Sequence, residues 1–125
     1  MDNGQAKATV LGFNDCINAR DIERLPQMMT DDHVFIDASG NSVSGKPACV
    51  GAWQRFFAAF PDYPNDFAQI YANEELLVIV GCSSCSDPRL DGPALWTAKV
   101  RGHRVSEWRV IEDTVVNRNK LGVAQ

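Results

Sequence analysis

The stretch VSGKPACVGAWQRFFAAFP, residues 43–61, decides the fold that we expect for this chain. Its apolar residues recur at intervals of three, four and three, which is the spacing of one face of an α-helix. Pro47 lies where the first turn of a helix tolerates a proline, and Pro61 ends the pattern. The sequence therefore predicts a long amphipathic helix. The residues of its apolar face are Val50, Trp53, Phe57 and Phe60.

Two helical patterns and a hairpin precede this helix. Residues 6–19 have the spacing of an amphipathic helix, and residues 22–29 that of a shorter one, which Pro26 should bend or shorten. Residues 33–37 alternate as a strand does, and a turn leads from them to a second short strand at residues 42–44.

Strand patterns follow the long helix. They cover residues 66–72, 76–85, 94–101 and 104–113, and Gly102-His103 suits a type II′ turn between the last two. The expected order is α-α-β-β-α-β-β-β-β. This order predicts a single α+β domain over residues 1–125, with an antiparallel sheet wrapped around the long helix.

The composition excludes several classes of function. The 125 residues carry a net charge of −4, and the basic residues are interleaved with acids, so we expect no nucleic-acid or membrane partner. The longest apolar run, residues 76–80, is too short to cross a bilayer, and the N-terminus lacks the pattern of a signal peptide. The sequence predicts a cytoplasmic protein.

Several strings in this order resemble the NTF2-like superfamily, in particular its SnoaL-like polyketide cyclase and ketosteroid isomerase branch. They are FNDCINARDIERL (13–25), TDDHVFIDASG (30–40), VSGKPACVGAWQRFF (43–57) and VRGHRVSEWRVIEDT (100–114). The resemblance implies a cone-shaped curved sheet of the cystatin-like α+β type, with helices closing one side over a deep apolar cavity. It also implies a homodimer through the outer face of the sheet.

Asp37 is the strongest candidate for a catalytic group. It follows Val34, Phe35 and Ile36, so it can lie in an apolar mouth, where the loss of hydration makes a carboxylate a better base. The resemblance places it where ketosteroid isomerases carry the aspartate that moves a proton next to a carbonyl. The alternative is structural, because aspartate also favours the first position of a turn such as Asp-Ala-Ser-Gly.

The chain departs from the isomerase pattern at two positions. The tyrosine and the protonated aspartate that stabilise the oxyanion in that family would fall at Phe13 and at or near Trp96. Loss of one such donor typically costs about a hundredfold in rate, so we do not expect a steroid isomerase with the same mechanism. The last acid of the epoxide hydrolase relatives would fall at Val110, which disfavours that chemistry too.

Three further residues are candidates for acid or base roles. Alternation along the last strand puts Glu112 on the face that the resemblance assigns to the cavity. Asp113 matches a late aspartate of SnoaL-like chains, and His33 has the same parity as Asp37. Each has a structural alternative, which is a solvated strand end for the two acids and a solvated or capping role for the histidine.

Aromatic side chains are numerous for so small a domain. Core packing accounts for most of them, but around a hollow sheet Trp96 and Trp108 would form a flat apolar wall suited to a planar ring compound. The expected substrate-binding residues are Phe13, Ile17, Phe35, Trp53, Phe57, Trp96, Trp108 and Val110.

Cys82 and Cys85 form a CxxC string at the end of a predicted strand. Residues three apart on a strand point to opposite faces, so we interpret the pair as buried small hydrophobic residues and not as a redox or metal pair. The two histidines and four cysteines show no metal-ligand spacing, and we expect neither a metal nor an organic cofactor.

Two hypotheses of different classes follow. The first is a cofactor-independent acid/base enzyme, an isomerase, cyclase or dehydratase, that acts on a small apolar ring-containing carbonyl compound. Asp37 would be its base, with Glu112 or Asp113 as a second acid. The second, which the missing oxyanion donors favour, is a non-catalytic small-molecule-binding or dimerisation module.

Overall fold

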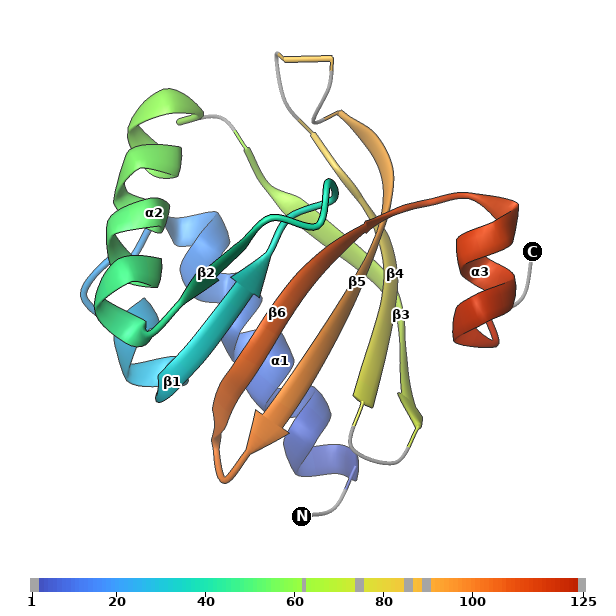
Figure 1. Ribbon diagram of the computed structural model, residues 1–125, viewed down its shortest axis with the longest axis horizontal. Coiled ribbons are helices and arrows are strands. Elements are labelled where there is room, and N and C mark those ends of the chain that lie inside the picture. Colours follow the sequence, from blue (N-terminus) through green and yellow to red (C-terminus); the bar gives the residue numbers. More distant parts are fainter. Residues whose placement is uncertain (1–2, 62, 74–75, 85–86, 89–90, 124–125) are drawn as a thin grey trace.

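The computed structural model describes residues 3–61, 63–73, 76–84, 87–88 and 91–123. Within them the expected order of elements is confirmed, with a 3₁₀ turn in place of the second helix and a further helix near the C-terminus (Figure 1). None of the helices in this part of the chain is long and apolar enough to span a membrane. The bounds are α1 Asn3–Ala19, η1 Leu25–Met28, β1 Met29–Ile36, β2 Ser42–Ser44, α2 Lys46–Ala59, β3 Asn65–Asn73, β4 Leu76–Ser83, β5 Gly92–Arg101, β6 Arg104–Glu112 and α3 Val115–Leu121.

The strands form one curved, unclosed sheet in the order β2-β1-β6-β5-β4-β3 (Figure 1). Neighbouring strands are antiparallel except β1 and β6, which run parallel. The expectation of a wholly antiparallel sheet was therefore wrong at this pair. A parallel pair needs a long crossover, which α2 and the β3–β5 meander supply here.

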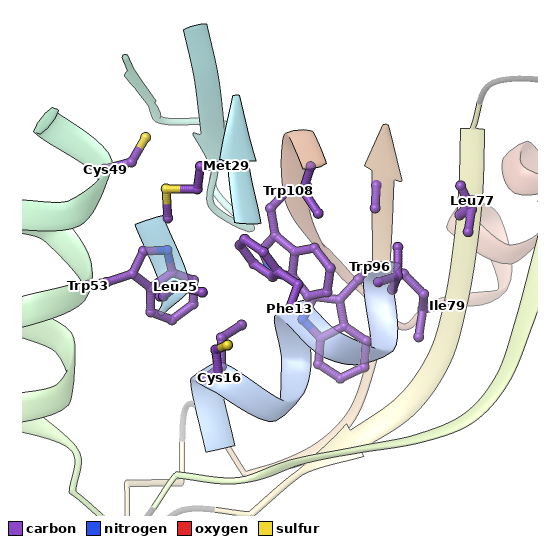
Figure 2. Close-up of a cluster of buried hydrophobic side chains, with 14 of the residues drawn as sticks. Phe13, Cys16, Leu25, Met29, Cys49, Trp53, Leu77, Ile79, Trp96 and Trp108 are labelled. Atoms are coloured by element: carbon purple, nitrogen blue, oxygen red, sulfur yellow. The ribbon is translucent and has the colours of Figure 1, made fainter. Parts of the chain in front are cut away.

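Helix α1 lies against the middle of one face of the sheet, where it contacts β3, β5 and β6. Val10, Phe13 and Ile17 of α1 are fully buried there. Helix α2, which we expected at the centre, instead contacts β1 and β2 at one end of the sheet. Figure 2 shows the buried cluster in which Phe13 of α1 packs against Trp108 of β6.

Two segments differ from the expected boundaries. The helix expected over residues 22–29 is only the 3₁₀ turn η1, because Pro26 near its start removes a backbone donor, and β1 already begins at Met29. Helix α3 was not expected. Its ends nevertheless carry ordinary signals, since the side chain of Thr114 accepts a hydrogen bond from the Asn117 N–H and Gly122 ends the helix with a φ of 70°.

The C-terminal segment covers part of the sheet face that points away from α1. Val78 and Leu95 point to this face, since they alternate with the core-facing residues of β4 and β5, and both are buried. Val123, which follows the last residue of α3 by two positions, is buried as well. The homodimer expected through this face stays a prediction, and the covered part would not contribute to its interface.

Candidate functional site

A cavity of about 340 Å³ lies between α2, the β1–β2 turn and the inner face of β5 and β6. This volume is near the lower end of the range for small-molecule pockets. Its aromatic lining consists of Phe35, Trp53, Phe56, Tyr63, Trp96 and Trp108. The remaining lining residues are Asp37, Ala38, Ser39, Ala52, Asn65 and Val110.

Ring contacts fix the aromatic walls of the cavity. On the α2 side, the Trp53 ring meets Phe35 and Phe56 edge to face, each with 5.6 Å between ring centroids. On the sheet side, Phe67 packs on both Trp96 and Trp108, with centroid distances of 5.1 and 6.1 Å. The two tryptophans lie on neighbouring strands and both line the cavity, which is the arrangement expected for a flat apolar wall.

Asp37 lines the cavity, as a catalytic residue would, and it also opens the β1–β2 turn, as the structural alternative requires. Its Oδ1 accepts hydrogen bonds from the backbone N–H groups of Ser39 and Asn41, both at 2.9 Å. Its Oδ2 accepts only a longer one, of 3.3 Å, from Nδ2 of Asn41. The turn therefore fixes the carboxylate through Oδ1. Most of the lone-pair capacity of Oδ2 stays available to accept a hydrogen bond or a proton from a ligand.

The two acids at the end of β6 do not line the cavity. Glu112 is exposed, and its carbonyl accepts a hydrogen bond from Nδ2 of Asn117. Asp113 forms a bidentate ion pair with Arg118 at 2.6 and 2.9 Å, which lowers the pKa of the carboxyl group. Both acids are thus engaged with α3, because the chain leaves the sheet directly after β6.

His33 is a core residue and neither a solvated nor a capping one, so that interpretation was wrong. It is fully buried, and its Nδ1 lies 2.7 Å from the Val105 carbonyl, which can only accept, so the proton is on Nδ1. Its ring lies 5.7 Å from that of Phe13, and its Nε2 has no hydrogen-bond partner among the described residues. It does not line the cavity, and burial lowers the pKa of the imidazole.

This burial predicts a loss of stability in mild acid. Because the folded pKa of His33 lies below the unfolded value of about 6.5, the unfolded chain binds the extra proton first. The free energy of unfolding should therefore fall as pH drops below about 6.5 and stop falling, for this group, below the folded pKa. Urea denaturation at pH 7.5 and 5.5 measures the effect. H33N should lose less stability than wild type between these pH values. H103N, at an exposed turn, is the control and should lose as much as wild type. Equal losses in H33N and wild type would contradict the link between His33 and the loss of stability in acid.

Three of the expected binding residues lie outside the cavity wall. Phe13 and Ile17 are fully buried beneath it, and Phe57 packs against Trp53 with 5.6 Å between ring centroids. Tyr63, which lies just before β3, and Asn65, its first residue, line the cavity but were not predicted to do so. The sequence could have indicated both residues. Residues two apart on a strand point to the same face, so Tyr63 and Asn65 are expected on the same face as Phe67.

The cysteines form no site in the described residues. Cys82 is exposed at the end of β4, so its interpretation as a buried residue was wrong, and Cys85 lies outside the described residues. Cys16 and Cys49 are buried, and burial raises the pKa of each thiol. In the ranges that the structure covers, no three histidine, cysteine or acidic side chains are grouped as a metal site.

Solved structures share the fold of this chain, and NTF2-like proteins are among them. An NTF2-like protein from Cytophaga hutchinsonii ATCC 33406 matches with a TM-score of 0.71 and 9% identity over 93% of each chain. An M. tuberculosis LEH-like epoxide hydrolase matches with a TM-score of 0.76 and 15% identity over 88% of this chain and 84% of its own. TerC, co-crystallised with polyporic acid, matches with a TM-score of 0.73 and 13% identity over 92% of this chain and 96% of its own.

Among proteins with this fold, the sequence itself identifies the family. Residues 10–117 match the model of the SnoaL-like domain, so the chain belongs to the SnoaL-like family. A comparison with curated proteins gave no match.

Proposed function

We propose that this protein binds a small planar carbonyl compound with an apolar ring system in its cavity and moves a proton on it, with Asp37 as the acid/base group. The observation that carries the proposal is the cavity itself, whose walls are aromatic and whose edge carries one fixed carboxylate. A TerC structure with polyporic acid and an epoxide hydrolase of the same fold support small-molecule binding in such a cavity.

The chemistry that suits this arrangement is proton abstraction from the carbon next to a carbonyl. Oδ2 of Asp37 takes the proton, and the electron pair of the broken C–H bond moves into an enolate whose charge lies on the carbonyl oxygen. Return of the proton to another carbon completes an isomerisation, and departure of a hydroxyl as water completes a dehydration. Both need only a carboxylate that alternates between base and acid.

A non-catalytic binding module is the second candidate. It is favoured by the hydrogen bonds of Asp37, which a turn residue would make in any case, and by the distance of Glu112 and Asp113 from the cavity lining. Both candidates need the cavity to bind a ligand. They differ in whether Asp37 then moves a proton.

Ligand binding is tested with 2-tetralone, a two-ring ketone, in a thermal-unfolding assay. At ten times its Kd a ligand stabilises the folded state by about 1.4 kcal/mol, or roughly 5 °C in Tm for a domain of this size. Ala52→Leu should abolish the shift because Ala52 lines the cavity, and Ala58→Leu, on the exposed side of α2, should retain it. No shift in wild type, or equal shifts in both variants, would contradict binding in this cavity.

A further inference from the structure

A chain of hydrogen bonds runs behind the cavity wall from Tyr63 to Asn65. Oγ of Ser83 donates to Oδ1 of Asn65 at 2.8 Å, and the Tyr63 hydroxyl lies 2.8 Å from the same Oγ. The hydroxyl proton of Ser83 is used on Asn65, so Tyr63 is the donor to Ser83. Tyr63 and Asn65 line the cavity, whereas Ser83 lies behind them.

The backbone of Asn65 is held just as firmly by helix α1. Oδ1 of Asn18 accepts a hydrogen bond from the Asn65 N–H at 2.8 Å. Nδ2 of Asn14 and Nδ2 of Asn18 donate to the Asn65 carbonyl at 3.2 and 2.9 Å. Every polar group of Asn65 except its Nδ2 therefore has a partner, and its position does not depend on a ligand.

The Nδ2 amide of Asn65 is a hydrogen-bond donor at the cavity wall that has no partner among the described residues. Asn65 is only 2% exposed and lines the cavity, and no described residue accepts a hydrogen bond from its Nδ2. Nδ2 is not among the buried side-chain atoms that lack a partner in the described residues, so it keeps contact with the open space of the cavity, where a ligand oxygen can accept its hydrogen bond. The donors upstream, Tyr63 and Ser83, polarise the amide and make its N–H groups stronger donors.

We propose that Nδ2 of Asn65 donates a hydrogen bond to the carbonyl oxygen of the ligand. The inference rests on the proposed function, since it assigns the oxygen-binding group of the same cavity. This donor would stabilise the ligand oxygen. In ketosteroid isomerases a tyrosine and a protonated aspartate do so, at positions that Phe13 and Trp96 occupy or lie near in this chain. It also narrows the ligand class to compounds with an oxygen acceptor on the ring system, oriented with that oxygen toward Asn65.

The closing experiment compares two probes of the same shape, 2-tetralone and tetralin, which lacks the carbonyl oxygen. Wild type should bind the ketone about 3- to 10-fold more tightly than tetralin, the range that one net hydrogen bond gives. N65L is close to asparagine in size but has no donor, so it should lose this preference while tetralin affinity changes less than about twofold. S83A should weaken the preference only in part, and S84A, at an exposed neighbour, should keep it.

An infrared measurement on the wild-type complex makes the test independent of any variant. The carbonyl stretch of bound 2-tetralone should lie at lower frequency than in cyclohexane, because a hydrogen bond weakens the C=O bond. A bound stretch equal to that in cyclohexane, or an equal ketone preference in N65L, would overturn the role of Asn65 and leave the proposed function standing. Failure of both probes to bind wild type would instead overturn the proposed function.

Discussion

The variant D37N is expected to slow the exchange of the α protons of bound 2-tetralone with solvent by about 10²–10⁴-fold, the usual contribution of a positioned base. Asparagine keeps an oxygen that can accept the hydrogen bonds from the Ser39 and Asn41 N–H groups, so the β1–β2 turn should survive. What is lost is the second carboxylate oxygen, which takes the proton. The rate is measured by the decay of the α-proton NMR signals in D₂O at saturating ketone.

An exposed acid gives the matched control for this variant. D66N removes a carboxylate from the surface of β3 and should exchange the α protons at the wild-type rate. Unchanged exchange in D37N, with the ketone still bound, would show that Asp37 only opens a turn. The binding-module candidate would then replace the enzyme.

The variant G81A is expected to lose on the order of 3 kcal/mol or more of its free energy of unfolding. A Cβ on Gly81 would lie 2.1 Å from the Asp66 carbonyl oxygen and 3.0 Å from Cα of Phe67. Both atoms belong to the backbone of β3, at the point where the β3–β4 register shifts, so the strands themselves must move apart. Such a loss is a large part of the stability of a small domain, and urea denaturation measures it.

Gly51 offers the matched control in helix α2. A Cβ there would meet only the Arg55 side chain, at an ordinary 3.5 Å, so G51A should gain up to about 1 kcal/mol from the higher helix propensity of alanine. A G81A protein with the wild-type denaturation midpoint would contradict the close approach of β3 and β4. Since Phe67 packs on Trp96 and Trp108, the cavity wall would be displaced as well.

Much of the fold could be predicted because apolar periodicity marks helices and strands directly. The helix observed at Lys46–Ala59 follows from its regular apolar spacing and its flanking prolines. The parallel pairing of β1 with β6 could not be predicted in this way, because alternation identifies a strand but not its partner across a long crossover. The start of β1 was missed because it includes Asp31 and Asp32, two residues that are uncommon in strands.

The site was predictable only where its chemistry was local. Asp37 could be singled out because it directly follows an apolar strand in the sequence. Asn65 could not, since its position depends on Ser83 across the sheet and on Asn14 and Asn18 of a distant helix. Glu112 was expected in the cavity from alternation alone, which does not register that a strand end is exposed.

Binding of a planar ring ketone in the cavity can be followed directly through the three tryptophans of the chain. Trp53, Trp96 and Trp108 all line the cavity, so every indole N–H signal of the protein comes from its wall. In a ¹H–¹⁵N NMR titration with 2-tetralone, we expect all three indole signals to shift along one binding curve in wild type and to stay unchanged in A52L. Indole signals that do not move in wild type at saturating ketone would contradict binding in the cavity.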